Sequence, residues 1–222
     1  IEYHIDGFIL NPQIAPMEAI YADPILKKTK IMAHRIDFQT VMRRFLKGDE
    51  GMVEGVMYWL RRISEKDGTF NCITNQNGFT LNDLVSYDRK HNEPNGENNQ
   101  DGPEYNYSWN CGAEGPTRKK AIAKLRDGQI RNAFLLLLLA QGTPCILAGD
   151  EFGNAQKGNN NVYCQDNPVG WTDWTHLEQK KDLHDFVKQL IAVRKNHPVF
   201  WPTKEMCGLD EARCGVPDVS YH

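Results

Sequence analysis

The sequence lacks the residue patterns that mark several common functional classes. Its six cysteines form no C-x-x-C pair and its seven histidines form no H-E-x-x-H motif, so the spacing favours neither a metal site nor a disulfide framework. We therefore expect thiols of a cytoplasmic protein that uses no metal and no cofactor. The 26 basic and 29 acidic residues nearly balance, for a net charge of -3. A nucleic acid or an anionic membrane is thus not the expected partner, since both select a basic surface.

A membrane-spanning segment is also missing from the sequence. The longest apolar run covers residues 134–140, far short of the ~20 residues that cross a bilayer, and is typical of a buried helix. The chain has no signal peptide and opens on Ile1 instead of methionine, so we expect it to begin within a longer protein.

Strand-like and helix-like segments alternate along most of the chain. Strands are predicted at residues 3–10, 29–33, 70–74 and 145–148, and helices at residues 15–22, 40–46, 53–63, 121–141 and 180–196. This alternation predicts an α/β fold with a parallel sheet. Four strands are too few for a closed eight-stranded barrel, which takes about 250 residues. Residues 88–116 form a long polar loop rich in Asn, Gly and Glu, and loops of that length are usually functional or disordered.

Three segments carry a resemblance to a known family. Residues 77–87 read NGFTLNDLVSY, and KHNEPNGENN follows at residues 90–99. QGTP at residues 141–144 leads into LAGDEFG, and GNNNVYCQDN covers residues 158–167. Together these segments closely resemble the second half of isoamylase-type glycogen debranching enzymes, glycoside hydrolases of the α-amylase superfamily. That family cuts α-1,6 branch linkages with a (β/α)8 TIM barrel.

The resemblance implies a partial or degenerate barrel that covers the region of strands four to eight. On this alignment the four predicted strands are barrel strands four, five, seven and eight. The stretch between Asp37 and Arg43 is shorter than in active relatives, where strand six and its loops are expected. Residues 1–200 would form the partial barrel, and residues 201–222 would lead into a missing C-terminal β-domain.

The resemblance also identifies the positions of the three catalytic carboxylates. The nucleophile ends the strand-four pattern Asp-Gly-Phe-Arg-Phe-Asp, where this chain has Asp-Gly-Phe-Ile-Leu and then Asn11. The general acid of Ala-Glu-Pro-Trp-Asp falls on His34, and the strand-seven His-Asp pair falls on Gln76 and Asn77. Glycoside hydrolysis needs paired carboxyl groups, and an amide cannot form the glycosyl-ester intermediate productively. We therefore expect a pseudoenzyme in which no catalytic residue is active.

Binding of an α-glucan such as glycogen, starch or a maltooligosaccharide is the function expected to survive. Sugar sites combine aromatic platforms with amides and carboxylates that bind hydroxyls. The candidate substrate-binding residues are Gln76, Asp150, Glu151, Asn159, Asn160, Asn161, Tyr163, Gln165, Asp166, Trp171 and Trp174, with Trp109 as a further platform. A simpler interpretation of the Asp150–Glu151 pair is that it makes structural hydrogen bonds. A simpler interpretation of Trp171 and Trp174 is that they pack against the barrel rim.

Two other hypotheses remain open at the level of sequence. The chain could be a working α-1,6-glucosidase with an unusual site around His34, Asp150 and Glu151. It could instead be an interaction module whose open half-barrel pairs with a partner chain or a second copy, since unpaired strand edges invite association.

Overall fold

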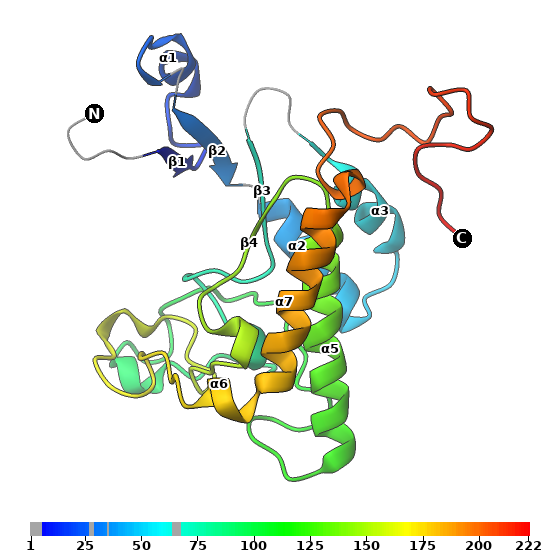
Figure 1. Ribbon diagram of the computed structural model, residues 1–222. Helices are drawn as coiled ribbons and strands as arrows, with labels where there is room; N and C mark the ends of the chain where they lie inside the picture. Colours follow the sequence, from blue (N-terminus) through cyan, green and yellow to red (C-terminus); the bar gives the residue numbers. More distant parts are fainter. Residues whose placement is uncertain (1–5, 27–28, 35, 64–67) are drawn as a thin grey trace.

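A four-stranded parallel sheet organises the chain (Figure 1). The computed structural model describes residues 6–26, 29–34, 36–63 and 68–222. Its strands are β1 (Gly7–Leu10), β2 (Lys30–His34), β3 (Gly68–Cys72) and β4 (Thr143–Cys145), in the order β1-β2-β3-β4. Each strand lies beside the next one in the chain, so the sheet is wound in one direction. The α/β class predicted from the sequence is confirmed.

Seven α-helices and four short 3-10 helices follow or connect these strands within the described residues. The α-helices are α1 (Met17–Ala22), α2 (Ile36–Lys47), α3 (Val53–Arg61), α4 (Leu81–Leu84), α5 (Lys120–Leu139), α6 (His176–Gln179) and α7 (Lys181–Asn196). The 3-10 helices are η2 (Glu93–Asn95), η3 (Asp150–Phe152), η4 (Val162–Cys164) and η5 (Pro198–Phe200).

Several boundaries differ from the sequence prediction. Strand β3 covers Gly68–Cys72 instead of residues 70–74, and two further differences have clear physical reasons. The fourth strand starts at Thr143 and ends at Cys145, whereas the sequence predicted residues 145–148. Because Cys72 is the last residue of β3 and pairs with Cys145, the ladder has no partner beyond that point. Pro144 is tolerated since β4 is an edge strand. Helix α2 starts four residues early because Phe38 and Met42 lie one turn apart on the same buried face.

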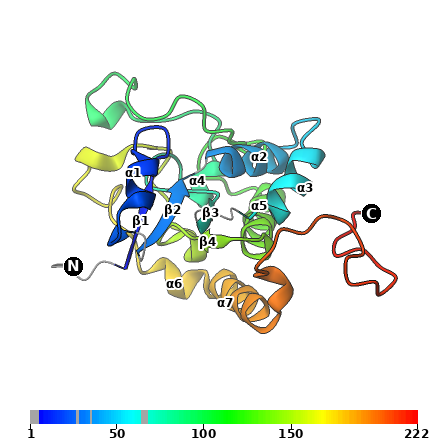
Figure 2. The same ribbon diagram turned by 90° about the horizontal axis from the view of Figure 1, so that it is seen from above.

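The helices cover β3 and β4 far more than they cover β1 and β2. Seen from above, α2, α5 and α7 lie around one side of β3 and β4 (Figure 2). Their apolar faces meet in one core that contains Phe38, Phe79, Phe134 and Leu183. Phe134, Leu137, Leu138 and Ala140 of the apolar run are buried in this core, as the sequence predicted, and Leu135 and Leu136 pack against it. In the described part of the chain, no helix combines the length and the apolarity that a membrane crossing requires.

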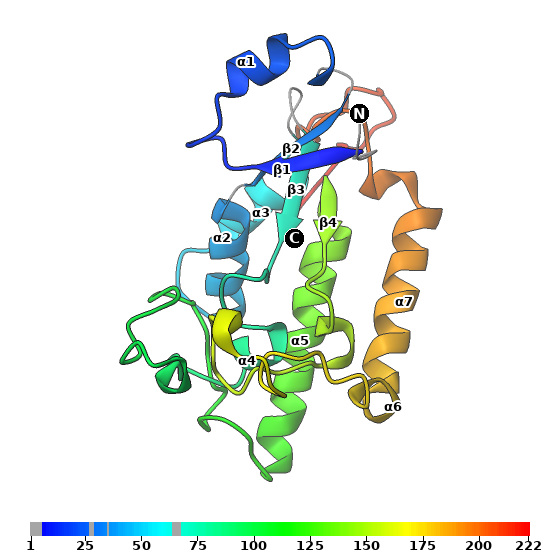
Figure 3. The ribbon, with the colours of Figure 1, turned by 90° about the vertical axis from the view of Figure 1, so that its left-hand side faces the viewer.

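The β1–α1–β2 unit stands away from the helical body (Figure 3). Strand β1 is the free edge of the sheet, and its Phe8 and Ile9 side chains are 39% and 50% exposed. At the other end of the chain, residues 201–222 contain no helix or strand and run along α3. Glu205 pairs with Arg62 at 2.7 Å, and the Tyr221 hydroxyl donates to the Met57 carbonyl at 2.9 Å.

The C-terminal end of α5 is held by one arginine from α7. The last carbonyls of a helix have no partner inside the helix. Arg194 Nη1 donates to the carbonyls of Leu138 and Ala140 at 2.7 and 2.6 Å, and its Nη2 donates to the Gly142 carbonyl. The residue is 9% exposed, so these bonds are shielded from water.

We predict that Arg194→Met lowers the free energy of unfolding by about 2–3 kcal/mol. The substitution keeps the apolar stem but leaves buried carbonyls without a donor. Urea unfolding followed by circular dichroism measures the effect, with the exposed neighbour Lys195→Met as the matched control. Equal stability of the two variants would contradict the role given to Arg194.

Candidate functional site

The three catalytic positions of the resembled family do not meet at one level of the sheet. Asn11 directly follows β1, and His34 is the last residue of β2. The register pairs Leu10 with Ala33 and His34 with Phe70, so Asn11 lies level with Phe70 of β3. Asn77 comes seven residues later in the chain. Strands β3 and β4 extend two residues past this level, about 7 Å at the rise of a strand.

The exposed amides at two of these positions have local roles. The Asn11 side chain accepts the backbone N–H of Gln13 at 2.9 Å and so caps the turn after β1. Gln76 and Asn77 are exposed in the loop after β3, where the Asn77 backbone donates to Asn75 Oδ1 at 2.9 Å. Neither turn brings a carboxylate to the ends of these strands.

Asp150 is buried where the chain leaves β4. It is 2% exposed and accepts hydrogen bonds from the Thr74 hydroxyl and from the Leu81 N–H, the latter at 2.9 Å. Burial raises the pKa of this carboxyl to about 7. Its neighbour Glu151 accepts the Gly149 N–H at 2.9 Å. Asp150 therefore joins the segments that follow β3 and β4, and no solvent-exposed oxygen faces a substrate.

A second buried carboxylate, Asp83 in α4, was missed in the sequence interpretation. Its side chain is fully buried and accepts the backbone N–H groups of Gln156 and Gly158 at 2.7 and 3.3 Å. Burial raises its pKa to about 6. The sequence did carry a signal for this residue, because Thr80 and Asp83 have the spacing of a capping box. In the structure, Thr80 Oγ1 accepts the Asp83 N–H at 3.2 Å.

The cation close to these carboxylates is Arg43 of α2, which the sequence interpretation also did not single out. It is 4% exposed, and burial lowers its pKa to about 10. Its Nε donates to the Ile73 carbonyl at 2.6 Å, and Nη1 donates to the Asn106 carbonyl at 3.2 Å. Arg43 thus links α2 to the end of β3 and to the polar loop, residues 88–116.

Amide side chains hold the polar loop against residues 156–167. Asn92 and Asn160 exchange two hydrogen bonds at 2.8 and 2.9 Å, and Asn159 donates to Asn95 Oδ1 at 2.7 Å. Asn159 and Asn160 are 2% and 1% exposed, so these two predicted sugar-binding amides are engaged inside the protein. Asn161 and Gln165 are half-buried and bond to Asp101 and to Asn95.

The remaining candidates form an exposed aromatic segment, which we define as residues 163–174. Tyr163, Trp171 and Trp174 are 68%, 54% and 67% exposed. Trp171 Nε1 donates to Asp166 at 2.9 Å, and the Trp174 ring lies 5.3 Å from the Phe152 ring. The two tryptophans present most of their surface to solvent instead of packing as core.

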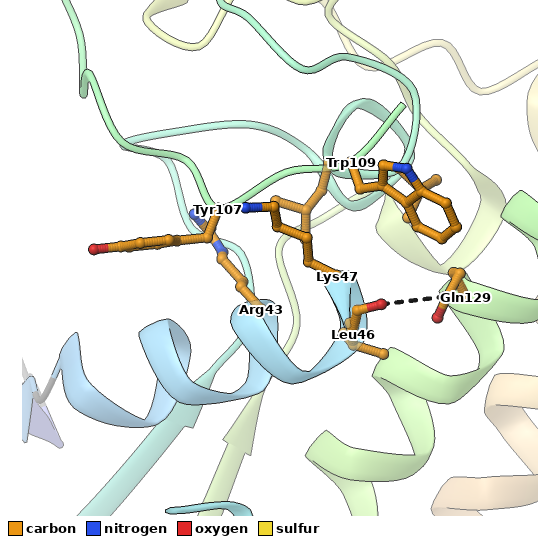
Figure 4. A pocket seen from close by; sticks show the side chains of 8 residues that line it. Arg43, Leu46, Lys47, Tyr107, Trp109 and Gln129 are labelled. Atoms are coloured by element: carbon orange, nitrogen blue, oxygen red, sulfur yellow. Dashed lines mark hydrogen bonds between the residues drawn. The ribbon is translucent and has the colours of Figure 1, made fainter. Parts of the chain in front are cut away.

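Trp109 lies elsewhere, in a small pocket between α2 and α5 (Figure 4). Lys47 and Gln129 line the same pocket, and Gln129 Nε2 donates to the Leu46 carbonyl at 3.2 Å. The Trp109 ring is partly buried against the core. Within the residues that the structure describes, no cluster of three or more His, Cys, Asp or Glu side chains could hold a metal ion.

Solved structures with the same fold are pullulanases. The pullulanase of Anoxybacillus sp. LM18-11 complexed with maltotetraose superposes with a TM-score of 0.57 at 20% identity, over 79% of this chain and 24% of that chain. The pullulanase of Bacillus acidopullulyticus superposes with a TM-score of 0.55 at 20% identity, and the match covers 78% of this chain and 19% of that chain. This likeness defines a fragment of a pullulanase-like α/β fold.

The chain is a homologue of GlgX proteins, isoamylases and glycogen debranching enzymes. It is 54% identical to the glycogen operon protein GlgX homolog of Mycobacterium tuberculosis over 90% of its length and 34% of the relative's. The glycogen debranching enzyme of Erwinia tasmaniensis is 37% identical over 89% of this chain and 36% of the relative. Isoamylase 3 of Oryza sativa is 35% identical over 89% of this chain and 31% of the relative. No protein-family profile matches the chain.

The chain spans about a third of the length of these curated relatives. Its alignment with the GlgX homolog covers 242 positions, more than the 222 residues of the chain itself. The relative therefore has residues inside the matched stretch that this chain lacks.

We predict that Asp150→Asn flattens the pH dependence of stability between pH 4 and 7. The raised pKa means that the folded protein holds a proton which the unfolded chain releases near its usual value of about 4. This contribution is fully present below pH 4 and is lost as the pH rises through about 7. Urea unfolding across this range measures the slope.

The matched control is Glu93→Gln, which removes an exposed carboxylate elsewhere in the chain and should leave the slope as it is in the unsubstituted chain. Some slope should remain in Asp150→Asn, because Asp83 also has a raised pKa. An unchanged slope in Asp150→Asn would show that Asp150 ionises as readily in the folded protein as in the unfolded chain.

Proposed function

We propose that this chain is a catalytically inactive relative of the glycogen debranching enzymes that retains α-glucan binding. The observation that carries the proposal is the substitution of all three family carboxylates, by Asn11, His34 and Asn77. Identity of 54% to a GlgX homolog over 90% of the chain supports comparing these positions with the family pattern. Two amides and an imidazole cannot supply a nucleophile and a general acid about 5 Å apart, as retaining glycosidases do.

The strand register bears on the third of these positions. Asn11 lies level with Phe70 while Asn77 lies beyond the end of β3. Catalytic groups must be held within about half an ångström of their working geometry. Asn11 and His34 lie at one level on neighbouring strands, so a carboxylate at position 77 would have to be brought to their level by the loop after β3.

The competing hypothesis of an active site around His34, Asp150 and Glu151 has less support. Asp150 is buried, and it accepts two hydrogen bonds that keep it in the interior. A general acid or a nucleophile must reach the glycosidic oxygen or the anomeric carbon. A carboxylate under the protein surface cannot do so without dismantling the turn after β4.

The strand order supports a degenerate barrel in which β1, β2, β3 and β4 correspond to barrel strands four, five, seven and eight. Between β2 and β3, the described residues form α2 and α3 and contain no strand. Strand β2 pairs directly with β3.

Glucan binding is assigned to the aromatic segment. Exposed indole and phenol rings offer flat apolar faces that stack on the apolar face of glucose. Asp166 is exposed within the same segment and offers its carboxylate to sugar hydroxyls. Pullulanases of this fold have been solved in complex with maltotetraose and with maltohexaose, which makes linear maltooligosaccharides the first ligands to test.

We predict binding of maltoheptaose and of a branched limit dextrin in calorimetry, with no release of reducing sugar from either. Trp174→Ala and Trp171→Ala should each weaken binding about 5-fold or more, since an aromatic platform contributes roughly 1–3 kcal/mol. The matched control is Trp201→Ala, which removes an indole of similar exposure outside this segment.

The two halves of the proposal fail separately in this experiment. Sugar release would contradict the claim of inactivity, whatever the binding result. The absence of heat with both ligands, or equal losses in all three tryptophan variants, would contradict the assignment of a glucan site to the aromatic segment.

A further inference from the structure

Two cysteines from distant parts of the sequence lie side by side in the sheet. Cys72 ends β3 and Cys145 ends β4, and the two are register partners in the parallel ladder. Register partners point to the same face of a sheet. The structure holds both as thiols.

The spacing of this pair suits a disulfide bond. Neighbouring strands lie about 4.8 Å apart, inside the 4.4–6.8 Å range of Cα separations that disulfides span. The thiols also influence each other electrostatically. Burial raises the pKa of the Cys72 thiol, Arg43 opposes the rise, and the adjacent Cys145 adds to it.

We propose that Cys72 and Cys145 form a reversible disulfide that fastens β4 to β3. A small-molecule disulfide such as oxidised glutathione is the oxidant. Cys145 is the entry point because it is half-buried, whereas Cys72 is 2% exposed. Cys72 is therefore the resolving residue.

The exchange proceeds in two steps that conserve atoms and electrons. The Cys145 thiolate attacks one sulfur of oxidised glutathione, the S–S bond breaks, and one glutathione leaves as a thiolate. The Cys72 thiol gives its proton to solvent and attacks the Cys145 sulfur of the mixed disulfide. The second glutathione then leaves, so that two protein thiols are oxidised and one disulfide is reduced to two thiols.

The geometry favours a bond that can be reduced again. In parallel strands the Cβ atoms of partners lie at about the interstrand distance of 4.8 Å, slightly beyond the roughly 3.5–4.5 Å range that disulfides prefer. Closing the bond draws the strands together, and strained disulfides are the more easily reduced ones.

The bond would act on a weak part of the sheet. Strand β4 has three residues and pairs only with β3. Cys72 and Cys145 are 73 residues apart in the chain, so the cross-link closes a long loop and restricts the unfolded state strongly. A rise in Tm on the order of 10 °C follows for a chain of this size.

The test treats the whole chain with oxidised glutathione and maps tryptic peptides without reduction. Trypsin places each cysteine of the pair in its own peptide, residues 67–89 and residues 132–157. We expect these two peptides to be linked, the link to disappear with dithiothreitol, and the Tm to rise only while the link is present. Cys145→Ser should abolish the link and the rise in Tm, while the matched control Cys164→Ser should retain both.

Cys72→Ala gives a second readout. This variant should trap glutathione on Cys145, because the resolving thiol is gone. The proposal is overturned if Cys72 remains a thiol in the unsubstituted chain while Cys145 or the exposed cysteines take up glutathione. It is also overturned if Cys72 links to Cys111 instead of Cys145.

Discussion

Asp150 holds together the segments that follow the last two strands. Its carboxylate accepts hydrogen bonds from Thr74, just after β3, and from the N-terminal residue of α4, Leu81. Burying a carboxylate is costly unless its oxygens are bonded, and both oxygens of Asp150 have donors. Asp83 of α4 in turn accepts the N–H of Gly158. Asp150 therefore holds α4 in place, and Asp83 on α4 holds the segment around Gly158.

This chain of contacts explains why the region is ordered although it contains few regular elements. A long polar loop cannot pay for its ordering with apolar burial. Here the buried amides of Asn92, Asn159 and Asn160 bond to each other and to the backbone instead. The aromatic segment then follows a rigid support, which would lower the entropy that exposed rings lose in the proposed binding of a sugar.

The proposed loss of catalysis is compatible with an intact scaffold because the two concern different residues. The catalytic positions lie on β1, β2 and the loop after β3, whereas Arg43, Asp83 and Asp150 build the support around β3 and β4. A substitution such as that at Asn11 affects an exposed turn and removes no core contact. The support can therefore persist in a chain that performs no hydrolysis.

The sequence by itself determined the α/β class, the helices α5 and α7, the relationship to debranching enzymes and the chemical identity of the substituted positions. These follow from periodicity over neighbouring residues and from local motifs, which need no knowledge of distant contacts. Only the tertiary structure decided that Asn11 lies level with Phe70, that Asn159 and Asn160 are buried, and that Cys72 faces Cys145. Strand register and burial depend on pairing between segments far apart in the chain, and a one-residue slip would change every such neighbour.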